Sequence, residues 1–292
     1  MTLCVSHSPG YARDSEERFG PAFRAGLAAA RDAVRAFAPT LVIYFGSDHR
    51  RAFTDTVPSF SVVTGAEGRG DLLSPTGPYD VPGETAGALA VHLLDSGFDI
   101  AVTRHVALDH GFGQTAGDLF GRLDAVPVIP VFINCASAPL ARPGRAADLG
   151  AAAGAFARDL ASGERVLFLG SGGLSHDPPT LALTAEGLPQ DERNKISAAH
   201  REAAKDRIRP DWDADLMTRL GSADPAWASA VTQADIDPAG VGANEARTWL
   251  AAYAAGGRPL KPVVYEPVRE WLTGMGICLS ENVSENVPEA AA

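Results

Sequence analysis

Four of the seven histidines of this 292-residue chain lie just beyond short apolar runs that are typical of buried strands. Ligands of α/β proteins bind beyond the carboxyl ends of strands, so four histidines in such places indicate one site. Neutral imidazole binds iron, zinc or copper, and it also shuttles protons near neutral pH. Two histidines and one carboxylate leave one face of an iron ion open, and two further histidines then serve as acid and base. The residues alone leave open which pair does which: His7, His49, His110 and His176.

The other three histidines have different surroundings in the sequence. His92 falls within an expected helix, and His200 falls on a charged helical segment. His105 is near the end of an expected strand but lacks the context of the other four. For these three we expect a packing or solvated role.

A glycine-rich stretch follows the apolar run at 165–170. Gly170–Gly173 has neither the Lys-Ser/Thr of a phosphate loop nor the GxGxxG pattern of a dinucleotide site. Around Ser175 the string also misses GxSxG, because Asp177 stands where the second glycine belongs. The stretch therefore predicts a tight turn that lets the backbone approach a ligand closely, and it disfavours a serine hydrolase.

The elements that must position these histidines alternate between apolar strands and longer helical segments. This alternation predicts an α/β single domain with a central mixed β-sheet and helices on both faces, over residues 1–279. Residues 280–292 are poor in apolar residues and are expected to be a disordered tail. Pro127 and Pro130 place the strand expected at 126–133 at a sheet edge or on a bulge.

Composition excludes several classes of function. The net charge of -11 argues against a nucleic-acid or anionic-membrane partner. No apolar run reaches the roughly 18–20 residues of a membrane helix. The start of the chain lacks the features of a signal peptide. Three widely spaced cysteines suggest reduced thiols, so we expect a cytoplasmic protein: Cys4, Cys135 and Cys278.

Several strings together resemble the class III extradiol dioxygenases, the superfamily of the protocatechuate 4,5-dioxygenase catalytic subunit. The strings keep the family's order over nearly the whole chain. They are CVSHSP, the strand ending in SDH, LDHGFGQ, VPVIPVFIN, RVLFLGSGGLSHDPP, WDADLM, EARTWLAAYAA and the Glu-Trp pair at 270–271. The resemblance implies Fe(II)-dependent cleavage of a catechol by O2, in a homo-oligomer without an organic cofactor. It further implies a 3-substituted catechol whose side chain carries a carboxylate.

The resemblance also implies roles for particular residues. His7 and His49 fall on the histidine ligands of Fe(II), and Glu270 falls on the carboxylate ligand, with Glu266 as the alternative. The proton donor and the proton acceptor correspond to His110 and His176. Asp48 and Asp109 precede two of the histidines; each either orients a ring or caps a turn.

This chain departs from the family's pattern after His49, where Arg50 and Arg51 stand. One of them is a candidate partner for a substrate carboxylate, because guanidinium pairs bidentately with that group. The alternative is that both are solvent-facing charges. Other functions also remain open: the same chemistry on another catechol or an aminophenol, a zinc-dependent hydrolase, or a non-catalytic binding member of the superfamily.

Overall fold

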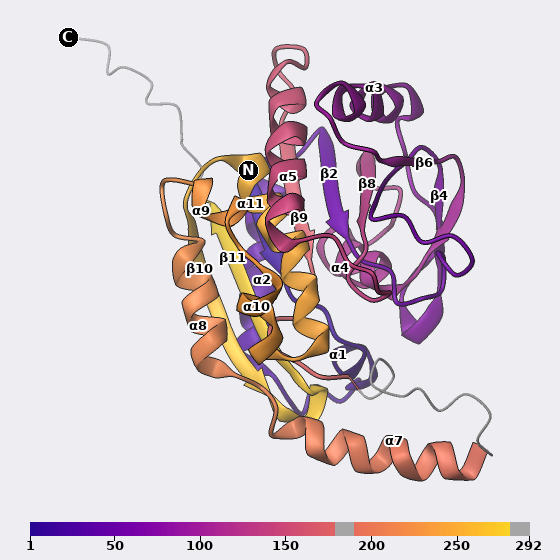
Figure 1. Cartoon of the computed structure of the whole chain (residues 1–292), viewed down its shortest axis with the longest axis vertical. Coiled ribbons are helices and arrows are strands. Elements are labelled where there is room, and N and C mark those ends of the chain that lie inside the picture. The colour runs from indigo at the N-terminus through magenta and orange to yellow at the C-terminus, as the bar shows by residue number, and fades with distance from the viewer. Residues whose placement is uncertain (179–189, 281–292) are drawn as a thin grey trace.

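The computed structural model describes residues 1–178 and 190–280, with the side chains of 190–194 and 197 left out. It shows one α/β body built on an eight-stranded mixed sheet with the order β10-β11-β1-β9-β2-β8-β3-β6 (Figure 1). The predicted fold class is thereby confirmed. A second sheet of three strands has the order β5-β4-β7. The strands are β1 (Thr2–Val5), β2 (Leu41–Gly46), β3 (Phe60–Val63), β4 (Ala66–Arg69), β5 (Thr76–Pro78), β6 (Ala101–Thr103), β7 (Val106–Leu108), β8 (Val128–Ile133), β9 (Val166–Ser171), β10 (Leu260–Val268) and β11 (Thr273–Ser280).

Helices cover both faces of the large sheet. One apolar core includes side chains of α2 and α4, and the other includes side chains of α3, α5, α8 and α11. The α-helices are α1 (Pro9–Arg13), α2 (Pro21–Phe37), α3 (Gly83–Asp95), α4 (His110–Phe120), α5 (Pro143–Arg158), α7 (Gln190–Lys205), α8 (Pro210–Arg219), α9 (Ala226–Ser229), α10 (Gln233–Ile236) and α11 (Ala246–Gly256). Short 3₁₀ helices are η1 (Asp71–Leu73), η2 (Asp237–Ala239), η3 (Val241–Glu245) and η4 (Arg269–Trp271).

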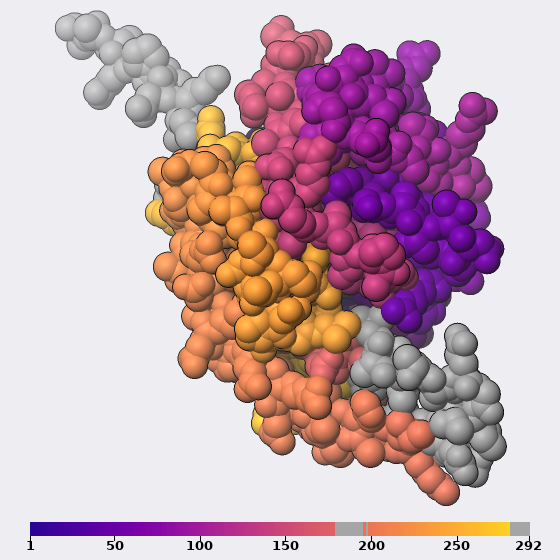
Figure 2. Space-filling view, in the orientation of Figure 1, coloured from indigo at the N-terminus to yellow at the C-terminus, as the bar shows by residue number. Residues whose placement is uncertain are grey.

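The four central strands point the same way. β1, β9, β2 and β8 are mutually parallel, so their carboxyl ends meet at one edge of the sheet. The N-terminal half, in indigo to magenta, packs against the orange and yellow C-terminal half in one continuous body (Figure 2). Consequently, residues that are far apart in the sequence reach the same edge.

The predicted edge position of β8 is wrong. β8 lies inside the sheet, parallel to β2 and antiparallel to β3. The ladder with β3 pairs Val131 with Val62 and does not extend to Pro130. A proline is therefore tolerated in an internal strand because it lies beyond the ladder that would need its missing N–H.

Helix α11, which follows directly on a buried glutamate, packs tightly against α5. A Cβ atom on Gly150 of α5 would lie 2.0 Å from the backbone oxygen of Ala251, and one on Gly154 would lie 2.2 Å from that of Ala255. No other residue fits at such a separation. These glycines let α11 lie deep against the sheet and so fix the position of its first turn.

Two further expectations concern the tail at 280–292 and membrane-spanning helices. The expected tail at 280–292 lies outside the described residues, apart from Ser280, which ends β11. Within the described part of the chain, no helix combines the length and the apolar character needed to cross a bilayer.

Candidate active site

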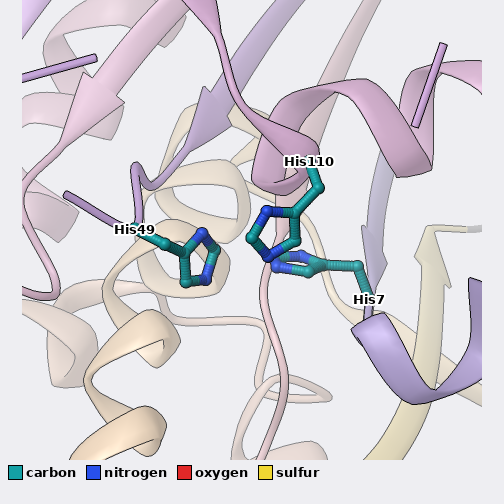
Figure 3. Close-up of side chains that lie close together, drawn as sticks. All are labelled: His7, His49 and His110. Atoms are coloured by element: carbon teal, nitrogen blue, oxygen red, sulfur yellow. The ribbon is translucent and has the colours of Figure 1, made fainter. Parts of the chain in front are cut away.

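The four histidines that follow strands come together at one edge of the sheet. The His7 and His49 rings lie 5.4 Å apart between centroids and nearly perpendicular, and the His49 and His110 rings stack at 4.2 Å (Figure 3). All four, His176 included, line one cavity of about 240 Å³. The arrangement joins histidines that follow β1, β2, β7 and β9.

Each of the first two histidines is held through its Nδ1 atom. Ser171 Oγ donates to Gly111 O at 3.1 Å, so Nδ1 of His7 is the donor in its 2.9 Å contact with that hydroxyl. Nδ1 of His49 donates to Asp109 Oδ2 at 3.0 Å. With Nδ1 engaged in this way, each ring turns its Nε2 toward the site.

The carboxylate beside these two nitrogens belongs to Glu245. Its Oε1 lies 2.9 Å from Nε2 of His49 and 3.7 Å from Nε2 of His7. Its Oε2 accepts a hydrogen bond from Gly173 N at 2.7 Å. Glu245 is 4% exposed and ends η3, directly before α11. The two ring nitrogens and one carboxylate oxygen therefore converge in a buried place.

Charge in this place favours a bound cation. Burial lowers the pKa of His7 to about 3, so this ring is neutral at physiological pH. Burial opposes ionisation of Glu245, but His7 and His49 outweigh it and lower the pKa of the carboxyl to about 2. Burial also opposes protonation of His49, but Asp109 and Glu245 hold its pKa well above the usual range. Two buried carboxylates thus demand positive charge at the point where the ligand atoms meet.

This donor set fits a divalent metal ion. An ion that replaced the proton on Nε2 of His49 would meet two neutral imidazoles and one ionised carboxylate, the ligands of a facial triad, each with a hydrogen-bonded partner behind it. A second set of histidine nitrogens is also close enough to share an ion, since His7, His49 and His110 have ring nitrogens within 4.8 Å of one another. His110 and Glu245 are thus competing third ligands.

The structure does not bring Glu270 or Glu266 to these histidines. Glu270 is exposed on η4, at the rim of the cavity. Glu266 uses Oε2 to accept a hydrogen bond from Phe23 N at 2.8 Å. Burial explains this difference from the expectation, because in the Glu-Trp pair the side chain of Trp271 is buried and that of Glu270 is exposed to solvent.

Of the two aspartates that precede histidines, only one contacts a ring. Asp109 caps α4 through Gly111 N and accepts from both the backbone N and Nδ1 of His49. Asp48 instead accepts hydrogen bonds from three successive backbone N–H groups in the turn at 51–53. Asp109 therefore orients a ring, whereas Asp48 holds the turn after His49.

Arg50 and Arg51 both line the cavity, but they are engaged differently. Nε and Nη2 of Arg50 both donate to Ala136 O, at 3.2 and 2.7 Å. Nη1 of Arg51 pairs with Asp71 Oδ2 at 3.1 Å. Nε of Arg51 is buried and has no hydrogen-bond partner among the described residues. Of these two arginines, Arg51 thus has a buried Nε without a partner among the described residues, and the cavity wall also includes Arg13 and Arg201.

The glycine-rich stretch lets the backbone approach the site, as the sequence predicts. A Cβ on Gly172 would lie 2.5 Å from Cβ of Glu245, and one on Gly173 would lie 2.8 Å from the ring of His176. Side chains at either position would displace a site residue.

His110 and His176 line the same cavity from two separate parts of the chain. His110 begins α4, and His176 follows β9. Nδ1 of His110 donates to Asp71 Oδ2 at 2.8 Å. Nδ1 of His176 donates to Leu174 O at 2.8 Å, and its Nε2 lies 3.9 Å from Glu245 Oε2. The remaining histidines do not line this cavity: His92, His105 and His200.

Two site residues, Glu245 and Asp71, cannot be found by searching for polar residues at the ends of apolar strands. Glu245 precedes a helix and follows no strand, and the signal that could have found it is that it begins the family-like string EARTWLAAYAA. Asp71 lies in a loop between two short strands and gives no comparable signal.

Comparisons of sequence and fold relate the chain to known proteins. The family described as the catalytic LigB subunit of aromatic ring-opening dioxygenase matches residues 1–276. A 2,3-dihydroxyphenylpropionate/2,3-dihydroxicinnamic acid 1,2-dioxygenase of Rhodococcus sp is 36% identical, over 98% of this chain and 99% of that protein. A protein of the same activity name from Pseudomonas putida is 38% identical, over 96% of this chain and 98% of its own length. A crystal structure of an uncharacterised Escherichia coli K12 protein superposes with a TM-score of 0.51 at 15% identity, covering 96% and 99% of the two chains, which supports the fold.

Proposed function

Because the chain belongs to the family of catalytic LigB subunits of aromatic ring-opening dioxygenases, we propose that it is an Fe(II)-dependent extradiol dioxygenase of catechols with a carboxylate side chain. The observation that carries the proposal is the convergence of His7, His49 and Glu245 beside two further histidines. In this reaction both atoms of O2 enter the product, and the ring bond next to the diol breaks.

We assign the metal ion to Nε2 of His7, Nε2 of His49 and Oε1 of Glu245. The family implies a metal cofactor, and the two-histidine, one-carboxylate set favours Fe(II). When bound, this ion supplies Lewis acidity that lowers the pKa of a coordinated phenol, together with open positions for both reactants. Asp109, Ser171 and Gly173 hold the three ligands in place from behind.

The proton transfers fall to the two remaining histidines. Nδ1 of His176 is engaged with Leu174 O, so in the neutral ring Nε2 is the nitrogen that can accept the second phenolic proton. By the family resemblance His110 is the proton donor for the later ring-opening step, and its stacking on the His49 ring supports a position beside the proposed metal site. Base and acid thus reach the same small cavity from separate elements.

The substrate carboxylate is assigned to Arg51. The relatives from Rhodococcus and Pseudomonas are named for substrates that carry a carboxylate on a three-carbon side chain. Arg51 lines the cavity with a buried Nε that lacks a partner among the described residues, whereas Arg50 directs its Nε and Nη2 at Ala136 O. A substrate carboxylate would satisfy that N–H, and the contact would be charge-assisted.

Arg51→Ala is expected to raise KM for 2,3-dihydroxyphenylpropionate roughly ten- to a hundredfold, since charge-assisted hydrogen bonds contribute about 1.5–3 kcal/mol. Arg50→Ala is the matched control and is expected to change KM much less. The measurement compares kcat/KM for this acid with kcat/KM for 3-propylcatechol. The ratio isolates the carboxylate contact, because any indirect effect through Asp71 acts on both substrates. An unchanged ratio in Arg51→Ala would exclude the contact.

Anaerobic loading with Fe(II), followed by oxygen-uptake measurements over substituted catechols and 2-aminophenol, tests the function as a whole. We expect uptake to require Fe(II) and to be fastest with the carboxylate-bearing catechol. A zinc-dependent hydrolase would keep its activity after iron removal and would consume no O2. A non-catalytic binding protein would take up no O2 with any compound.

A further inference from the structure

Asp71 contacts His110 through both of its carboxylate oxygens. Oδ1 accepts from the backbone N of His110 at 2.9 Å, and Oδ2 accepts from its Nδ1 at 2.8 Å. We propose that Asp71 is a positioning residue that fixes the ring of His110 with Nε2 toward the metal site. The inference rests on the proposed role of His110 in proton transfer.

The small second sheet brings Asp71 and His110 together. β4 and β7 are parallel and pair Gly68 with Leu108, so both strands end at the same edge. The chain beyond β4 turns through Gly70 to Asp71, and the chain beyond β7 continues through Asp109 to His110. Loops that follow neighbouring parallel strands therefore place a carboxylate against an imidazole.

The loop that carries Asp71 is held in an unusual conformation. Leu72 and Leu73 have φ values of 50° and 67°, which side-chain-bearing residues rarely adopt. Ser74 stabilises the turn by donating its backbone N and its Oγ to Asp71 O, at 3.0 and 2.8 Å. Backbone strain of this kind persists only where the surroundings enforce it, and it gathers at functional sites.

No other described group holds the His110 ring in this way. Asp109 Oδ2 is 3.6 Å from Nδ1 of His110, and it already accepts from the backbone N and Nδ1 of His49. The acceptor at Asp71 therefore decides which ring nitrogen carries the proton and which one faces the cavity. Arg51 pairs with Asp71 Oδ2 and keeps the carboxylate in place.

A double-mutant cycle on the iron-loaded enzyme tests the inference. With 3-propylcatechol, which lacks the carboxylate assigned to Arg51, Asp71→Leu is expected to lower kcat roughly ten- to a hundredfold, with KM and iron content nearly unchanged. In a His110→Ala background the same substitution is expected to cause no further decrease in kcat. Asp71→Asn is expected to recover part of kcat, because its one amide oxygen can serve one of the two donors on His110.

The outcomes separate this inference from the proposed function. Full turnover in His110→Ala would overturn the role of His110 itself and, with it, the role of Asp71. A slow His110→Ala enzyme combined with an unimpaired Asp71→Leu enzyme would overturn the positioning role alone. So would equal losses from Asp71→Leu with and without His110, since these would indicate a general structural effect. If Asp71→Leu does not fold, the same cycle with Asp71→Asn decides, with a smaller expected loss.

Discussion

Glu245→Gln is expected to abolish stable iron binding, whereas Glu270→Gln is expected to bind one iron per chain. Removing a group behind a metal ligand already weakens a site roughly 10–100-fold, so loss of a ligand's charge should weaken it at least about 100-fold. Iron per chain after anaerobic loading and desalting measures the effect.

The two variants are matched, because each exchanges one carboxylate for an amide of the same shape. Glu270 is exposed and contacts none of the site histidines among the described residues, so its variant controls for the chemical change itself. His7→Ala and His49→Ala are expected to behave like Glu245→Gln. Full iron occupancy in Glu245→Gln, or loss of iron in Glu270→Gln, would return the ligand role to the Glu-Trp pair.

His176→Ala and His110→Ala are each expected to keep their iron and to lose roughly 10²–10⁴-fold in turnover, the usual contribution of a positioned acid or base. The reason is geometric: neither ring is needed to complete the set formed by His7, His49 and Glu245. The pH dependence of kcat/KM should lose one limb in each variant. Turnover and iron content are measured on the same preparations.

His200→Ala is the matched control, because His200 is an exposed histidine on α7 and should change neither quantity. Loss of iron in His110→Ala would make the three-histidine set the true ligand set. Loss of iron in His176→Ala would contradict its role as a base.

Residues at strand ends were the predictable part of the site. Apolar runs mark β1, β2 and β9, and parallel strands bring their carboxyl ends together, so the grouping of His7, His49 and His176 follows from pattern and topology. Glu245 does not follow, because it reaches the site from η3, after a series of short helices whose path no periodicity specifies. The two rival carboxylates, Glu266 and Glu270, are less buried than Glu245. Burial depends on tertiary packing, which the local sequence does not show.

The small sheet was unpredictable for a related reason. β4 reads Ala-Glu-Gly-Arg, without a β-branched or aromatic residue, and β5 reads Thr-Gly-Pro, in which a single threonine stands beside two residues that are rare in strands. These strands form because β7 and α4 lie beside them, so their existence depends on contacts outside the segment. The position of Asp71 depends on that sheet, so it could not be predicted from the sequence either.

The place of β1 in the middle of the sheet has a consequence for how the protein is made. β1 pairs with β9 and β11, so a strand near the amino end waits for partners that leave the ribosome far later. Until then Leu3 and Val5, both buried in the final structure, have no sheet to join. Contacts between such distant segments form slowly, and exposed apolar strands invite aggregation. The proposed metal ligands, from His7 to Glu245, are therefore brought together only after β9 and β11 have been made, so a shorter nascent chain cannot hold an ion with this set.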